Sequence, residues 1–131
     1  TGHRRDLNRP QFRLDAVERR LQDPDADATN VLAGLRHALE IRSAQPALHP
    51  DAAMTVLSSD RSDLVILKRS IDGDNALYAV HNITSNRLTL SLAQLRAESD
   101  SGFVDCLSGQ SFAARQQPSI EPYAVHWLVK P

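Results

Sequence analysis

The stretch DLVILKRSI-DGDN-ALYAVHNI, residues 63–83, decides the fold class that this sequence predicts. It contains two runs of apolar and β-branched residues, 63–71 and 76–83, on either side of a four-residue segment. Within that segment, Gly73 and Asn75 accept the positive φ angles that tight turns require. The stretch therefore predicts a β-hairpin with antiparallel strands.

Short β-rich runs separated by turn residues continue on both sides of this hairpin. The further candidate strands cover residues 54–58, 87–92, 103–107 and 123–130. A second turn, Thr84-Ser85-Asn86, should join the strand 76–83 to the next one by the same logic. Five or more short strands at this spacing favour an antiparallel sandwich built of hairpins, so the predicted fold class is mainly β.

Helical spacing replaces this pattern towards the N-terminus. Residues 1–13 are polar and aperiodic and predict a loop, and a short helix should follow from Leu14 and end at Asp23, just before Pro24. Asp25 or Asp27 can cap a second helix, which Pro46 stops. The three- and four-residue spacing of that helix is carried by Val31, Leu32, Leu35, Ala38, Leu39 and Arg42.

Composition limits the classes of protein to consider. The chain has 131 residues, of which 41% are apolar and 24% charged, and a formal net charge of −1. These values are typical of a folded domain and offer no field that would attract nucleic acid or an anionic membrane. The single cysteine, Cys106, cannot form an internal disulfide, and no run is long enough to span a membrane. We expect a cytoplasmic location, and because the chain begins at Thr1 we expect it to be a piece of a longer product.

Few residues suggest chemistry of their own. The five histidines lack the spacing of a metal site, and the sequence has neither a glycine-rich phosphate loop nor a framed nucleophilic serine. Asn82-Ile83-Thr84 matches a glycosylation sequon, but turn-forming Asn and Thr explain it better. We therefore predict no catalytic residue, no metal and no cofactor within this chain.

Two local features stand out from this background. The opening segment gathers His3, Arg4, Arg5 and Arg9 around a single acid, as either a solvated loop or a functional one. The last strand alternates its apolar side chains, with Leu128 on one face and Tyr123, Val125, Trp127 and Val129 on the other. For this strand we favour burial in the core over a platform for stacking sugars.

Four segments together resemble one family. They are TGHRRDLNR (1–9), similar to the family's G-R-x-I-N-R stretch; LAGLRHALEIRSAQPALHPDA (32–52), similar to its last barrel helix with the continuation R-x-x-x-P-A-F-H-P; FVDCLSGQSF (103–112), similar to a D-L-L-S-G turn; and SIEPYAVHWLVK (119–130), similar to its terminal strand P-Y-x-x-x-W-L. In this order they resemble the C-terminal region of bacterial sucrose phosphorylases and related α-glucoside phosphorylases of glycoside hydrolase family 13.

The resemblance implies a domain division and a reaction. Residues 1–45 would be the last loop and helices of a catalytic (β/α)₈ barrel, and residues 46–131 a C-terminal antiparallel β domain. The parent would be a glycosyltransferase acting in carbohydrate metabolism, and its partners would be the barrel, an α-glucoside and phosphate, without a cofactor. The catalytic carboxylates of the family lie on earlier barrel strands, so this chain alone is expected to be structural and not catalytic.

The resemblance carries one binding residue over to this sequence. Arg5 matches the first Arg of G-R-x-I-N-R, which contacts the glucose bound beside the scissile bond. This sequence departs from the pattern in placing Arg4 where Gly usually stands and Leu7 where Ile does, and its PALHP replaces PAFHP. Loss of the Gly can change the backbone path of the loop and therefore the direction in which the Arg5 side chain points.

Other functions stay open on the residues alone. A free-standing β-sandwich that binds carbohydrate or a protein partner is the alternative, and a purely structural module is a third. The apolar stripe of the second helix should pack on barrel elements in the parent. In the chain by itself, we expect the stripe to be hidden by self-association.

Overall fold

The computed structural model describes residues 11–58, 61–71, 75–95 and 102–131. The chain divides into two compact units, Thr1–Ala38 and Leu39–Pro131, and each is described by itself. The turn expected at residues 72–75 falls mostly outside the described residues, as does the greater part of the expected N-terminal loop.

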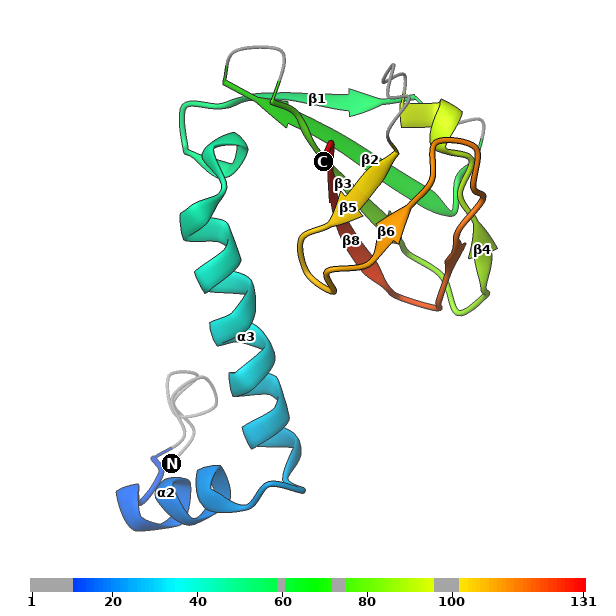
Figure 1. Ribbon diagram of the computed structural model, residues 1–131. Helices are drawn as coiled ribbons and strands as arrows, with labels where there is room; N and C mark the ends of the chain where they lie inside the picture. Colours follow the sequence, from blue (N-terminus) through cyan, green and yellow to red (C-terminus); the bar gives the residue numbers. More distant parts are fainter. Residues whose placement is uncertain (1–10, 59–60, 72–74, 96–101) are drawn as a thin grey trace, which may run out of the picture. The chain divides into compact units, whose positions relative to one another are not determined.

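The helical part contains the two predicted helices, α2 (Leu14–Gln22) and α3 (Asp27–Ala44) (Figure 1). Asp15 lies in the first turn of α2 and accepts hydrogen bonds from Arg19 one turn later. Pro24 follows the end of α2, and the short 3₁₀ helix η1 (Pro46–Leu48) follows α3, since proline cannot continue an α-helix. Neither α2 nor α3 contains a buried residue.

The β part is built on a six-stranded antiparallel sheet with the order β1-β2-β3-β8-β5-β6. Its strands are β1 (Ala53–Leu57), β2 (Leu64–Ser70), β3 (Leu77–Asn82), β5 (Phe103–Asp105), β6 (Ser111–Phe112) and β8 (Val125–Val129). A second sheet pairs β4 (Leu88–Thr89) with β7 (Ser119–Ile120). The predicted antiparallel pairing of β2 with β3 is confirmed, with Leu67 opposite Ala79. The fold class, mainly antiparallel β with two helices, is confirmed as well.

The segment after β3 differs from the prediction. Residues 84–86 form a bend as expected, but β4 has two residues instead of the six expected and pairs with β7, not with β3. The apolar residues that follow form the 3₁₀ helix η2 (Leu92–Leu95), in which Leu92 and Leu95 are buried. Burial of these leucines therefore comes from a helical turn and not from strand alternation.

Alternation along the strands divides the large sheet into two faces. The face that we call the inner face packs into the main core, formed by Leu64, Ile66, Ala76, Tyr78, Val80, Leu88, Leu90, Leu92, Leu95, Phe103, Phe112, Ile120 and Leu128. The opposite, outer face carries a smaller cluster in which Ala47 and Leu48 of η1 pack with Leu77 and Ala79. The two sheets and η2 thus enclose one core, and η1 covers part of the outer face.

Candidate functional site

The predicted substrate-binding residue lies outside the described residues. Arg5 falls within residues 1–10, as do Arg4 and Leu7, the positions at which the sequence departs from the family pattern. The role of Arg5 therefore stays a prediction. Among the residues that the structure does describe, no group of three or more histidine, cysteine or acidic side chains could hold a metal ion.

Asp105 is the one fully buried acidic side chain in the described part of the chain. Its Oδ1 accepts the backbone N–H of Trp127 at 2.8 Å, and its Oδ2 accepts the hydroxyl of Ser108 at 2.6 Å. Oδ2 also lies 3.0 Å from Nδ1 of His126, which donates because a carboxylate only accepts. Burial raises the pKa of Asp105, but these hydrogen bonds, led by the one from His126, outweigh burial and lower it below its ordinary value.

These groups include Ser, His and Asp but are not arranged for nucleophilic catalysis. In a catalytic triad the histidine stands between the serine and the acid, so that it can take the proton of the serine. Here Asp105 stands between Ser108 and His126 and contacts both directly. The network ties the turn after β5 to β8 and is structural. Residue-based reasoning missed it, although the D-x-x-S-G pattern ending at Gly109, which has a φ of +73°, signals such a turn.

The neighbouring thiol, that of Cys106, lies in a setting that disfavours its thiolate form. Cys106 is half-buried, its Sγ accepts a hydrogen bond from Nε2 of Gln45 at 3.4 Å, and burial together with the charge of Asp105 raises the pKa of the thiol. A raised pKa lowers the fraction of the thiol that is present as the nucleophilic thiolate at neutral pH.

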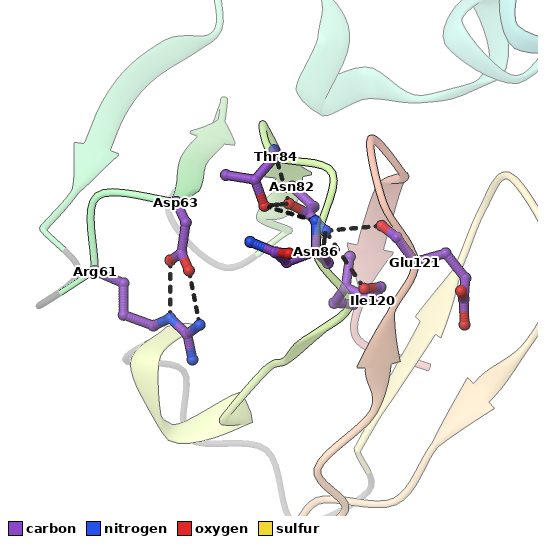
Figure 2. Close-up of polar contacts among 7 residues, drawn as sticks. All are labelled: Arg61, Asp63, Asn82, Thr84, Asn86, Ile120 and Glu121. Carbon is purple, nitrogen blue, oxygen red and sulfur yellow. Dashed lines mark hydrogen bonds and ion pairs between the residues drawn. The ribbon is translucent and has the colours of Figure 1, made fainter.

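Asn82 is the other buried polar side chain among the residues that the structure describes, and it holds the turn after β3 (Figure 2). Its Nδ2 donates to the carbonyl oxygens of Asn86 at 2.7 Å and Glu121 at 2.9 Å. Its Oδ1 accepts the N–H and the hydroxyl of Thr84 at 3.0 and 2.9 Å. The amide nitrogen that glycosylation would modify is therefore engaged in the interior, which agrees with the prediction of a turn-forming Asn.

Beside this turn, Figure 2 also shows Arg61 and Asp63, which form an ion pair at 2.8 Å. Both side chains reach solvent, and the guanidinium lowers the pKa of Asp63 by donating to its carboxylate. An exposed pair of this kind contributes little stability and leaves no free carboxylate for acid–base chemistry.

The aromatic residues of the last strand do not all lie where they were predicted. Leu128 is fully buried in the main core, as expected, but Trp127 is only half-buried against the cluster around η1. Val125, expected to be buried on the same face, is 39% exposed. Tyr123, expected to be buried, is 68% exposed, because its backbone has a φ of +56° and leaves the strand alternation before β8 begins. One exposed tyrosine in the described β unit does not make an aromatic row for sugar stacking.

Exposed apolar side chains occur on both helices and just before α2. Phe12, Leu14, Leu21 and Val31 are exposed, and so are Leu35 and Leu39 of α3, with Leu35 at 57%. Within the first unit, Phe12, Val17 and Leu21 line an apolar hollow of about 310 Å³. Exposed apolar side chains mark an interaction site where they cluster, and we regard those of α2 and those of α3 as candidate contact residues.

Comparison with known proteins finds a homologous enzyme that is much longer than this chain. The chain is 30% identical over 129 residues to the glucosylglycerate phosphorylase of Allomeiothermus silvanus, a match that covers 98% of this chain and 20% of that protein. The chain is homologous to a glycoside phosphorylase. This homology confirms the resemblance to the C-terminal region of α-glucoside phosphorylases of glycoside hydrolase family 13. No model of a known protein family matches the sequence.

Solved structures agree at the level of the fold. Two crystal structures of AmyP, one in complex with maltose and one of a variant with maltotriose, match with TM-scores of 0.56 and 0.57 and identities of 24% and 25%. Each match covers 71% of this chain and 19% of AmyP. The chain thus spans about a fifth of the length of the homologous phosphorylase and of AmyP. None of the helices in the described residues is long and apolar enough to cross a membrane.

Proposed function

We propose that this chain is the C-terminal part of a retaining α-glucoside phosphorylase and supports a catalytic barrel without supplying the reacting carboxylates. The homology over 98% of the chain and only 20% of the phosphorylase is the observation that carries the proposal. Residues 1–45 complete the barrel in this proposal, and residues 46–131 form the C-terminal β domain. The exposed apolar side of α2 and α3 supports it, because these helices lack any buried residue among those described.

The proposed reaction of the parent is a double displacement with retention. A carboxylate of the barrel attacks the anomeric carbon of the α-glucoside while an acid protonates the leaving oxygen. Phosphate then takes the glucosyl group from the covalent intermediate and restores the carboxylate. Glucosylglycerate, which the homologue is named for, and sucrose are the first donors to test. The reaction consumes phosphate and makes a sugar phosphate. Because this product is charged, it does not diffuse across a membrane, which favours a cytoplasmic location for the parent.

A direct assay compares two proteins. The full-length product that contains this chain and the 131-residue chain are each incubated with glucosylglycerate or sucrose, with and without inorganic phosphate, and glucose 1-phosphate is measured. We expect phosphate-dependent release by the full-length product and none by the chain alone. Release by the short chain that persists through further purification would contradict its structural role, and release of free glucose without phosphate would indicate a hydrolase.

The substrate-binding role of Arg5 has its own test in the full-length product. A guanidinium offers several fixed donors for sugar hydroxyls, and a charged hydrogen bond contributes about 1.5–3 kcal/mol. Arg5→Ala should therefore lower kcat/KM by about ten- to a hundredfold. Arg13→Ala is the matched control, because Arg13 is exposed and pairs only locally with Asp15 among the described contacts. Equal kinetics for the two variants would remove Arg5 from the site.

A further inference from the structure

The strand β1 forms one edge of the six-stranded sheet (Figure 1). Among the described strands only β2 pairs with it, and its first four residues are exposed. The strand reads AMTVL, without a charged residue, a proline or a glycine. Natural edge strands are usually protected from further pairing by charges, prolines, bulges or a covering element. Within the described residues, β1 has none of these protections.

The register of β2 shows which of its backbone groups point towards β1. In an antiparallel ladder the N–H and C=O of one residue point to the same side, and those of the next residue point to the other side. Ile83 donates its N–H to the carbonyl oxygen of Asp63, which lies directly opposite, at 3.2 Å. Asp63 and every second residue after it therefore point towards β3. The residues between them, of which Lys68 is one, point towards β1.

The same alternation identifies the open backbone groups of β1. Lys68 lies opposite Thr55, so the N–H and C=O of Thr55 are directed at β2. Those of its neighbours Met54 and Val56 point the other way, to the edge of the sheet. The side chains of Met54 and Val56 share one face and are 62% and 66% exposed. In the described part of the chain, this edge thus offers two N–H and two C=O groups for pairing with another strand.

We propose that β1 pairs with β1 of a second copy of this chain, in the antiparallel sense and about a two-fold axis at Thr55. This register places Met54 of one copy opposite Val56 of the other, so that the open residues of each copy meet those of the second. Each such pair exchanges two N–H···O=C hydrogen bonds, and the axis produces the pair twice. The two six-stranded sheets then become one continuous sheet.

The composition of β1 favours a second copy over a foreign strand. At the axis Thr55 faces Thr55 of the second copy, in the type of pair whose side chains lie close, and threonine pairs across strands are stabilising. Met54 and Val56 of the two copies contact each other on one face and leave water. Because β1 carries no charge, no like charges lie opposite one another. The strand is therefore complementary to itself, and the two-fold axis closes the assembly as a dimer.

Sedimentation over a dilution series measures this association in the 131-residue chain and in the full-length product. We expect both to form a dimer. Met54→Pro removes an N–H that only the second copy would use, and proline is tolerated in an edge strand at such a position. It should raise the dissociation constant about tenfold or more, since two of the new hydrogen bonds are lost. Thr55→Lys should do the same by placing two ammonium groups opposite each other at the axis. Thr89→Lys, at an exposed threonine of β4, is the matched control.

Two further measurements separate the pairing of β1 from other causes. Thr55→Lys mixed with Thr55→Glu should form a heterodimer, because opposite charges then face each other across the axis, and a chain that had failed to fold could not be rescued in this way. Leu35→Asp changes an exposed residue of α3 and should leave the dimer intact. A full-length product that stays monomeric overturns the inference. So does a dimer that Leu35→Asp dissociates and that Met54→Pro and Thr55→Lys do not. Phosphorylase activity bears on neither outcome, since the pairing of β1 does not rest on the proposed function.

Discussion

The helices and the β unit differ in where their apolar side chains lie. Every buried side chain among the described residues follows α3 in the sequence, from Ala47 to Leu128. The helices α2 and α3 contain comparable leucines and valines, yet Leu35 and Val31 are largely exposed. The β unit therefore buries its apolar side chains in its own core. The apolar side chains of the helices have no such core among the described residues and fit contact with another surface.

This contrast explains how one chain can contain both a self-sufficient domain and an incomplete one. A sheet with a packed second layer closes a core within about ninety residues, a length typical of small domains. Two consecutive helices cannot bury their apolar stripes without a third element. The homology to about a fifth of a phosphorylase agrees with this division, since the missing third element would belong to the rest of that protein.

The sharpest test compares one leucine from each part. Leu128→Ala empties a fully buried site in the main core and should lower the free energy of unfolding of the β unit by about 2–5 kcal/mol. Urea denaturation monitored by circular dichroism measures the loss. A change below that range would show that the core around β8 is less well packed than its burial indicates, and would weaken the contrast with the helices.

Trp127 lies between these extremes and should show an intermediate effect. It is half-buried against the cluster around η1, so Trp127→Ala should cost less than the roughly 3–5 kcal/mol of a fully buried aromatic site. Denaturation of the variant gives the value, and Tyr123→Ala serves as the exposed aromatic control. An unchanged midpoint for Trp127→Ala, together with quenching of the wild-type tryptophan fluorescence by maltose, would instead favour the free-standing sugar-binding module.

The buried carboxylate of Asp105 makes the stability of the β unit depend on pH. The pKa of Asp105 is lower in the folded state than its ordinary value of 3.8, so its contribution to stability is fully present above that value. The contribution is lost as the pH falls through the folded pKa, because protonation removes the negative charge that strengthens the hydrogen bonds from His126, Ser108 and the backbone.

Asp105→Asn should remove this acid sensitivity. Because an amide has one oxygen in place of two, it leaves part of the network unpaired and should cost about 1–3 kcal/mol at neutral pH. Thermal unfolding between pH 3 and pH 7 checks both expectations, with the exposed Glu121→Gln as the control. If the unfolding temperature of Asp105→Asn falls towards pH 3 as steeply as that of the wild type, the acid sensitivity belongs to other carboxylates.

Most of the fold could be predicted from the sequence, and the failures have physical causes. Two β-rich runs around a turn mark the hairpin of β2 and β3, and apolar residues at three- and four-residue spacing between prolines mark the two helices. The strands β6 and β7 have two residues each, too few for any period, and depend on partners far away in the chain. Tyr123 was misplaced because its left-handed backbone interrupts the alternation.

The site was less predictable than the fold. The Asp105 network joins a turn to a strand that begins twenty residues later, and no local pattern specifies that contact. Arg5 came from a resemblance and not from a spacing, and it lies outside the described residues, so its role stays a prediction. The turn-forming role of Asn82, in contrast, followed from side-chain chemistry within five residues, although its hydrogen bond to the carbonyl oxygen of Glu121 did not.

The smallest change in stability is expected for an exposed leucine of the helices. Leu35→Ala should change the stability of the 131-residue chain by no more than about 0.5 kcal/mol, because the side chain is already exposed. In the full-length product, where we propose that a barrel covers it, the same substitution should cost about 2–5 kcal/mol. Urea denaturation of both proteins gives the two values. An equally large loss in the short chain would mean that a second copy hides the stripe, and sedimentation would then show a dimer that Leu35→Asp dissociates.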